Sequence, residues 1–255
     1  MESETRRMTD QFRHLCSKSS HSCAVCRAAD TTAWCVLTPT EVEALNQSKV
    51  THSYEPGTVI YEVGAPCQGL FCINSGTLLI ERAAPGGEGR RVRLAEGGEI
   101  LGWADFFRNT PYRNRAVCQT AAVVCVIPAQ TVRGLLQHQP LLALKFLAEA
   151  AQDLDRSEKT DLEQTYASAR KRLALALAAL KNNHGEGSAT GDIRITLPIS
   201  RRDLADLIAV RPETLSRVIR ELETDGVATF AGRTVEIPDL DRLLDEIETP
   251  EATAA

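Results

Sequence analysis

Between Ser53 and Ile127, the chain alternates short apolar runs with segments rich in glycine and proline. Turn residues such as Pro85-Gly-Gly87 and Gly97-Gly98 separate these runs at short intervals. Strands are predicted for the runs Thr58–Glu62, Leu70–Ile73, Thr77–Glu81, Arg91–Ala95 and Ala121–Ile127. Short strands divided this often by glycine turns are typical of a β-sandwich or a β-roll.

After Pro128 the apolar residues follow a helical period instead. The pattern predicts one helix at Thr131–Gln137 and a long amphipathic helix from Leu141 to about Thr165. Its apolar stripe, spaced by three and four residues, consists of Leu144, Leu147, Ala151 and Leu154. The stripe could pack on the roll alone, but the length and spacing favour a partner helix in a coiled-coil-like homodimer.

Acidic residues lie beside this stripe. In a parallel homodimer Glu149, Asp153 and Asp155 would approach their own copies, and like charges repel. The sequence therefore predicts a dimer that is only marginally stable and can be switched.

A helix at Ala167–Lys181 and a polar linker at Asn182–Gly187 precede a two-helix pattern in Ile199–Gly226. Ser200 is the expected cap of its first helix, Ala209-Val210 the turn, and Gly226 the stop of the second helix. Val227–Phe230 and Thr234–Ile237 predict the two strands of a wing. The apolar positions are Leu204, Leu207, Ile208, Leu215, Val218, Ile219 and Leu222. This is the pattern of a winged helix-turn-helix.

The apolar spacing leaves one face of the second helix for polar residues, which are Arg211, Glu213, Thr214, Ser216, Arg217 and Arg220. Arginine can pair with guanine, glutamate can accept from the cytosine amino group, and serine can contact several bases. We therefore expect these six side chains to contact double-stranded DNA.

Charge is unevenly distributed in this chain of 255 residues, whose net charge is −5. From Tyr166 to Val235 there are eleven Lys and Arg against eight Asp and Glu, whereas Glu236–Ala255 holds seven acids and one Arg. A locally basic module can face phosphates although the whole chain is acidic. The polar N-terminus and the lack of long apolar runs favour a cytoplasmic protein without a membrane span.

The stretch Pro212-Glu-Thr-Leu-Ser-Arg217 resembles the recognition helix of the cyclic-AMP receptor protein / fumarate-nitrate-reductase regulator (CRP/FNR) superfamily of bacterial transcription regulators. The resemblance implies an α+β fold: a cyclic-nucleotide-binding-like β-roll, a long dimerisation helix and a C-terminal winged helix-turn-helix. The corresponding boundaries are 1–35 for a cysteine-rich sensory segment, 36–137 for the roll, 138–165 for the dimer helix and 166–248 for the DNA-binding domain.

The Glu-x-x-Ser-Arg pattern is most similar to the fumarate-nitrate-reductase regulator branch. It implies that Glu213, Ser216 and Arg217 read a palindrome with TTGAT-like half-sites, and that RNA polymerase is a partner. No enzymatic activity is implied.

The roll departs from the cyclic-nucleotide pattern of this family. Trp103 stands where a ligand-binding glutamate is expected, and Arg113 and Arg115 occur without the usual Arg-Ser pair. Cyclic AMP is therefore an unexpected ligand, although the two arginines could hold another anion.

Three of the eight cysteines, Cys23, Cys26 and Cys35, lie within thirteen residues. The C-x2-C pair can ligate one metal centre, and Cys35 can close on it if residues 27–34 loop around. A tetrahedral zinc or an iron–sulfur cubane needs a fourth thiolate. The sequence alone leaves open an iron–sulfur cluster, zinc and unligated thiols.

Val124-Cys-Val-Ile-Pro128 resembles the strand that supplies the fourth cysteine in oxygen-sensing family members. The resemblance implies that Cys23, Cys26, Cys35 and Cys125 hold a [4Fe-4S] cluster, with Cys16 as a competing ligand. Because the loop from Cys26 to Cys35 is longer than in those members, oxygen, nitric oxide and general oxidation all remain possible signals.

The other cysteines, Cys67, Cys72 and Cys118, are interpreted as buried packing residues. A regulator gated by an effector in the roll is the first alternative function. A thiol–disulfide oxidoreductase is a distant one, because Cys23 is neither preceded by an apolar strand nor followed by an apolar helix.

Overall fold

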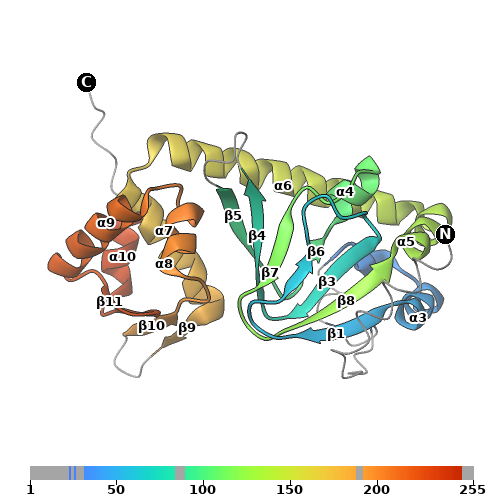
Figure 1. Ribbon diagram of the computed structural model, residues 1–255, viewed down its shortest axis with the longest axis horizontal. Coiled ribbons are helices and arrows are strands. Elements are labelled where there is room, and N and C mark those ends of the chain that lie inside the picture. The colour runs from blue at the N-terminus through green and yellow to red at the C-terminus, as the bar shows by residue number, and fades with distance from the viewer. Residues whose placement is uncertain (1–22, 24–25, 27–31, 84–89, 188–191, 249–255) are drawn as a thin grey trace. The chain divides into compact units, whose positions relative to one another are not determined.

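The computed structural model describes residues 23, 26, 32–83, 90–187 and 192–248 (Figure 1). The chain divides into two compact units. One extends to Arg82 and resumes at Arg93–Asp153, and the other comprises Ala83–Val92 and Leu154 onward. In the described part, no helix is both long enough and apolar enough to cross a bilayer.

Two four-stranded antiparallel sheets form the N-terminal roll (Figure 1). Their orders are β1-β8-β3-β6 and β2-β7-β4-β5. The strands are β1 Val50–Tyr54, β2 Val59–Tyr61, β3 Gly69–Ser75, β4 Thr77–Ala83, β5 Arg90–Glu96, β6 Ile100–Leu101, β7 Arg115–Cys118 and β8 Ala122–Pro128. All five predicted strands are confirmed, whereas β1, β6 and β7 were not anticipated.

The sheet that contains β3 and β8 is buried on both faces. Phe71 and Ile73 of β3 belong to the core between the two sheets. Their neighbours Leu70 and Cys72 belong to a second core, which helices cover. Because successive side chains of a strand point to opposite faces, this alternation assigns each residue of β3 to one core or the other.

Helices cover the outer face of this sheet. They are the 3-10 turn η3 Ala33–Val36 and the α-helices α3 Pro39–Ser48, α4 Trp103–Arg108, α5 Ala129–His138 and α6 Pro140–Tyr166. Thr38 caps α3 and forms a capping box with Glu41. The long helix predicted from Leu141 to about Thr165 is confirmed as α6. Helix α4 was not anticipated, because six residues are too few to show a helical period.

Gly69 marks a close approach of β3 to β8. A methyl group there would overlap the Ile127 carbonyl oxygen, and it would lie 3.0 Å from the Ala129 nitrogen. We expect Gly69→Ala to lower the free energy of unfolding by about 1–3 kcal/mol, because backbone atoms cannot yield as a flexible side chain does. Urea denaturation measures this change.

Gly134 in α5 provides the control, because a methyl group there meets nothing within 4 Å. We expect Gly134→Ala to raise the free energy of unfolding by about 0.5–1 kcal/mol, as alanine favours a helix. If both variants changed the free energy of unfolding by the same amount, the close approach of β3 to β8 at Gly69 would not be the cause of the destabilisation.

The second unit contains the winged helix-turn-helix (Figure 1). Its helices are α7 Ala169–His184, α8 Arg201–Leu207, α9 Pro212–Thr224 and α10 Leu240–Glu248. Its sheet, in the order β11-β12-β10-β9, consists of β9 Gly185–Gly187, β10 Ile193–Thr196, β11 Thr229–Ala231 and β12 Thr234–Ile237. The predicted wing strands and the Ser200 cap are confirmed.

One prediction for this unit needs correction. The segment Asn182–Gly187 is not a linker, since α7 continues to His184 and Gly185–Gly187 pair with β10 as strand β9. Helix α10 and strand β10 were not anticipated. The turn between α8 and α9 lies where it was predicted, with Ala209 at a positive φ of 52°.

Candidate thiol site and nucleic-acid interface

Three of the four predicted ligands are held at the helix-covered face of the roll. Cys125 of β8 is buried there, with its sulfur 3.4 Å from the Thr51 hydroxyl of β1. The Cys26 thiol donates to Asn74 Oδ1 at 3.3 Å. Cys23 packs against the same core, and its backbone N–H donates to Asn46 Oδ1 at 3.2 Å.

Cys72 lies with these thiols, although the sequence indicated only a packing role for it. It is the register partner of Cys125 on the adjacent strand. Burial raises the pKa of the Cys72 thiol, and the nearby Cys125, Cys23 and Cys26 raise it further. It is buried as predicted, and it also accepts a hydrogen bond from Trp34 Nε1 at 3.1 Å. The structure thus gathers Cys23, Cys26, Cys72 and Cys125, which we call the thiol group.

Cys35 is placed differently. Its side chain is exposed on η3, whereas the neighbouring Trp34 is buried against the helix-covered core. Within the described residues, no three cysteine, histidine or acidic side chains are close enough to share a metal ion. Cys16 lies outside the described residues. The geometry therefore places three predicted ligands near one another and leaves the fourth on the outside.

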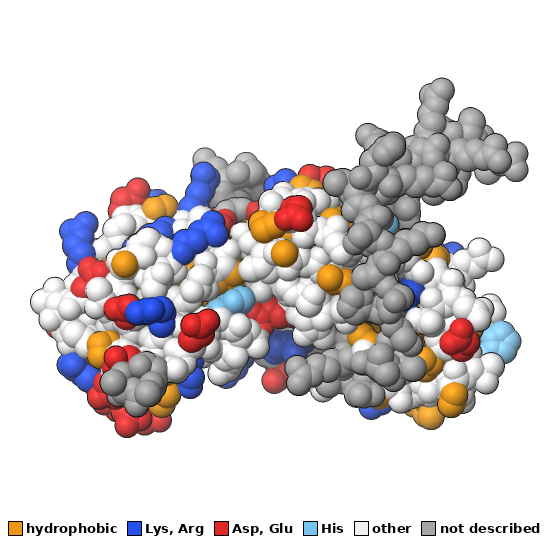
Figure 2. All heavy atoms as spheres, turned by 90° about the horizontal axis from the view of Figure 1, so that it is seen from below, with side chains coloured by type: hydrophobic (Ala, Val, Ile, Leu, Met, Phe, Trp, Pro, Cys, Tyr) orange, Lys and Arg blue, Asp and Glu red, His pale blue; other side chains and the backbone are white. Residues whose placement is uncertain are grey.

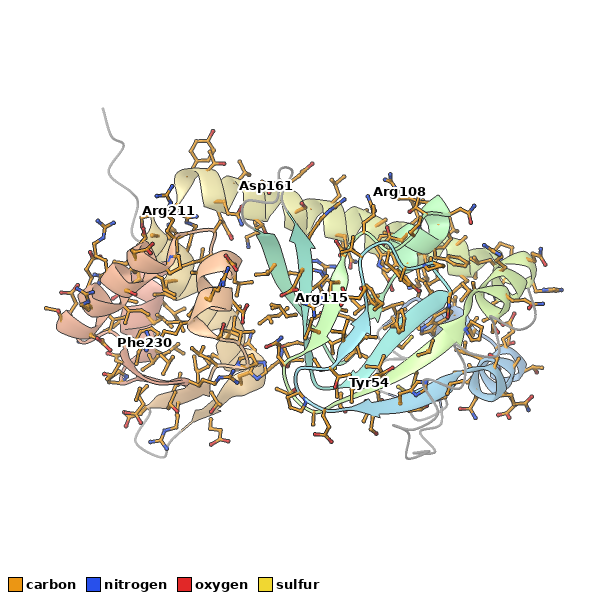
Figure 3. The ribbon with its side chains drawn as sticks, viewed as in Figure 1. Tyr54, Arg108, Arg115, Asp161, Arg211 and Phe230 are labelled. Atoms are coloured by element: carbon orange, nitrogen blue, oxygen red, sulfur yellow. The ribbon has the colours of Figure 1, made fainter. Side chains whose placement is uncertain are left out.

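The arginines of the roll are already paired with carboxylates. Arg113 Nε lies 2.6 Å from Oδ1 of Asp105, which is 4% exposed. Arg115, labelled in Figure 3, pairs with Glu62 at 3.1 Å and Glu81 at 3.2 Å. An anionic ligand at Arg113 would have to displace the buried carboxylate of Asp105, which is costly, whereas the exposed pair of Arg115 with Glu62 contributes little and is exchanged more easily. The pairing of Arg113 with Asp105 therefore disfavours an anion bound at that side chain.

The six predicted DNA-contacting residues lie on or next to α9. Its apolar face is buried through Leu215, Val218, Ile219 and Leu222. Thr214 is half-buried, and the exposed residues are Arg211, Glu213, Ser216, Arg217 and Arg220. Arg211 is the residue that precedes the helix (Figure 3). The helix therefore presents one polar face, as the spacing predicted.

Contacts within α9 hold two of these side chains. The Ser216 hydroxyl donates to the Pro212 carbonyl oxygen at 2.9 Å. Arg217 lies 3.8 Å from Glu221, and its side chain is 71% exposed. A surface pair at this distance contributes little stability, so Arg217 can exchange Glu221 for another partner at low cost. On the side that Figure 2 shows, acidic and basic side chains are interspersed, so basic residues do not dominate that surface.

Two arginines of α7, which the sequence analysis missed, fix the helix-turn-helix. Arg172 donates to the carbonyl oxygens of Ile208 at 2.8 Å and Ala209 at 3.2 Å, at the turn itself. Arg170 forms two hydrogen bonds with Glu246 of α10. It also lies 2.6 Å from Asp225, at the end of α9. These pairings join residues far apart in sequence, so no local pattern could have revealed them.

Helix α6 has two apolar faces. Leu142 and Phe146 are buried in the helix-covered core. The predicted stripe faces outward: Leu144 is 59% exposed and Leu147 is 65% exposed. Ala151 and Leu154 are exposed as well. An exposed stripe of large apolar side chains marks a surface suited to a protein partner.

Two family models match this chain. Residues 51–139 match the cyclic nucleotide-binding domain, and residues 171–246 match the Crp-like helix-turn-helix domain. The chain is 24% identical over 238 residues to the transcriptional activator protein FnrL of Cereibacter sphaeroides, covering 89% of this chain and 92% of that protein. It is 23% identical over 188 residues to the anaerobic regulatory protein of Pasteurella multocida, covering 73% and 68%.

Solved structures show the same fold. FixK2 from Bradyrhizobium japonicum matches 80% of this chain and 99% of its own, with a TM-score of 0.66 and 22% identity. A putative cyclic nucleotide binding protein from Ruegeria pomeroyi matches 90% and 98%, with a TM-score of 0.62 and 27% identity. The order of roll, long helix and helix-turn-helix is therefore shared with these proteins.

Proposed function

The chain belongs to the CRP/FNR superfamily of DNA-binding transcription regulators, which are not enzymes, and from that premise we propose its signal and its DNA site. We propose that it senses oxygen, nitric oxide or redox state through an N-terminal [4Fe-4S] cluster. As a cytoplasmic homodimer, it binds a palindrome with TTGAT-like half-sites and contacts RNA polymerase.

The placement of the thiols carries the sensory part of this proposal. Cys23, near the start of the chain, packs against the core that contains Cys125 of β8. Burial raises the pKa of the Cys125 thiol most, and both Cys23 and Cys26 raise it further. Thiolates are the usual ligands of iron–sulfur clusters, so the donor set fits such a group in its chemistry. Cys23, Cys26, Cys35 and Cys125 would hold the cluster. When bound, it would supply a centre that reacts with oxygen, nitric oxide or oxidants.

The protein would contribute the attachment of the N-terminal segment. Asn46 of α3 and Asn74 of β3 hydrogen-bond to Cys23 and Cys26 and so hold these two residues at the roll. Thiolate ligation would tie the same segment to β8 much more firmly, because a buried ligand such as Cys125 cannot move away. Loss of the cluster would leave the hydrogen bonds alone to hold the segment.

DNA recognition follows from the face of α9. In a homodimer, two copies of α9 would enter successive major grooves about 34 Å apart, which requires a palindromic site. Glu213 and Arg217 are exposed on that face and have the chemistry to read base edges.

Dimerisation through α6 is testable at Leu147. We expect Leu147→Ala to raise the dimer dissociation constant by about tenfold, because the lost methyl groups would no longer be buried in the interface. Sedimentation equilibrium measures this constant. Leu244→Ala is the control, since Leu244 is an exposed leucine on α10, and an equal effect there would contradict the assignment of the interface.

Anaerobic purification followed by an absorption spectrum and iron and sulfide determination tests the proposal. We expect about four irons and four sulfides per chain, with visible colour that bleaches in air. DNA binding is then measured with a TTGAT palindrome before and after exposure to air. A colourless protein with stoichiometric zinc, or with no metal, would overturn the proposal and transfer the sensory function to the roll.

A further inference from the structure

Trp34 joins the cysteine-bearing segment to two other parts of the roll unit. Its side chain is only 4% exposed. Its indole N–H donates to Cys72 Sγ on β3 at 3.1 Å. Its ring meets that of Phe146 on α6 edge to face, with centroids 5.6 Å apart and an interplanar angle of 86°. Trp34 is therefore in direct contact with both the thiol group and the long helix.

Trp34 and the predicted ligand Cys35 are consecutive residues of the 3-10 turn η3. A 3-10 helix has three residues per turn, so neighbouring side chains point about 120° apart. Trp34 points into the core, and Cys35 is exposed. The turn is held by the Leu37 N–H, which donates to the Trp34 carbonyl oxygen at 3.1 Å. Such a turn can direct only one of these two side chains at the thiol group.

We propose that Trp34 and Cys35 alternate in facing the thiol group, so that Trp34 is the positioning residue that transmits cluster ligation to α6. This inference rests on the cluster proposed above. In the ligating arrangement, Cys35 would give its thiol proton to solvent, and its thiolate would help to hold the cluster. The turn rotates to bring its sulfur inward, and Trp34 leaves both Cys72 and Phe146.

Phe146 is well placed to convert this movement into a change at the dimer surface. It lies next to Leu147 and two residues from Leu144, both of which belong to the exposed stripe of α6. Its ring also contacts Phe107 of α4, with centroids 5.2 Å apart. When Trp34 leaves, Phe146 loses its aromatic contact with Trp34 and keeps the one with Phe107. Because protein cores are close-packed, Phe146 and its helical turn must shift to refill the space.

Tryptophan fluorescence tests the movement directly, because the chain has only two tryptophans, Trp34 and Trp103. In a Trp103→Phe variant, Trp34 is the single indole. Upon anaerobic cluster assembly, we expect its emission to shift to longer wavelength and its quenching by acrylamide to rise several-fold. The matched control is Trp34→Phe, in which only Trp103 emits. The cluster absorbs light and quenches each indole according to its distance, so only a wavelength shift specific to Trp34, and not a loss of intensity, supports the proposal.

The outcomes separate this inference from the proposed function. If the protein takes up no iron and sulfide, the proposed function fails, and the inference fails with it. A full cluster with unchanged Trp34 emission overturns the alternation alone. The alternation is also overturned if Cys35→Ser retains the cluster while Cys72→Ser loses it. The ligands would then be the thiol group, and Trp34 would stay in place.

A second measurement tests the link to α6. We expect cluster assembly to tighten the wild-type dimer, and Phe146→Leu to reduce that tightening by about three- to tenfold, as an edge-to-face aromatic contact is lost. Phe71→Leu is the control, because Phe71 is a buried ring that stacks on Tyr61 rather than on Trp34. Equal reductions in both variants would show a general packing effect and contradict a route through Phe146.

Discussion

Replacing Cys125 with serine is expected to abolish cluster assembly and, with it, high-affinity DNA binding. Iron should fall from about four per chain to less than one, because a serine hydroxyl does not ionise and is a poor ligand for iron. Cys125 is buried on β8, with 5% of its side chain exposed, and it is the ligand that the roll supplies in the proposed set. Iron and sulfide analysis of the anaerobic protein and binding to a TTGAT palindrome measure the effect.

Cys118→Ser distinguishes loss of a ligand from loss of packing. Cys118 is also a buried cysteine of the roll, but it belongs to the core between the two sheets rather than to the thiol group. Burial raises the pKa of its thiol to about 11, which keeps it protonated at neutral pH. We expect this variant to lose some stability and to retain the cluster. An equal loss of iron in both variants would mean that Cys125 supports the fold and not the cluster.

Arg217→Ala is expected to weaken binding to the TTGAT palindrome by about 10- to 100-fold, with little change in folding. Its side chain is 71% exposed, and its closest carboxylate, Glu221, is 3.8 Å away, so the free protein depends little on it. A base contact also predicts relaxed preference at one position of each half-site. Fluorescence anisotropy with the palindrome and with single-base variants measures both effects.

Arg93→Ala provides the charge-matched control for Arg217→Ala. Arg93 is exposed on the roll and pairs with Glu99 at 2.8 Å, so its removal changes the net charge equally without touching α9. We expect its effect on DNA affinity to be less than about twofold. If Arg217→Ala weakened all sequences equally and reduced only the salt dependence, Arg217 would contact phosphates and not bases.

Local patterns along the chain were sufficient to predict most of the secondary structure. The period of α6, the capping boxes at Thr38 and Ser200 and the turn at Ala209 depend on neighbouring residues alone. The polar face of α9 follows from the spacing of its apolar residues in the same way. The short elements β6, β7 and α4 were missed because two to six residues carry too little periodicity.

The candidate sites depend more on contacts between distant residues. The sequence identified Cys23, Cys26 and Cys125 as partners only through a resemblance, and it interpreted Cys72 as a packing residue. The register of β3 and β8 decides that Cys72 faces Cys125, since a slip by one residue would move it to the opposite core. Contacts with Glu62 and Glu81 likewise show that Arg115 is already paired with carboxylates, which its neighbours in the sequence do not reveal.

Apolar periodicity and turn residues, which act over a few positions, were enough to predict the order of roll, long helix and helix-turn-helix and the polar face of α9. The tertiary structure alone decided that Trp34 faces inward while Cys35 faces outward, and that Arg170 and Arg172 hold the helix-turn-helix. These choices arise from packing between segments 36 to 112 residues apart, such as Arg172 with Ile208 and Trp34 with Phe146. No local pattern encodes contacts over such distances.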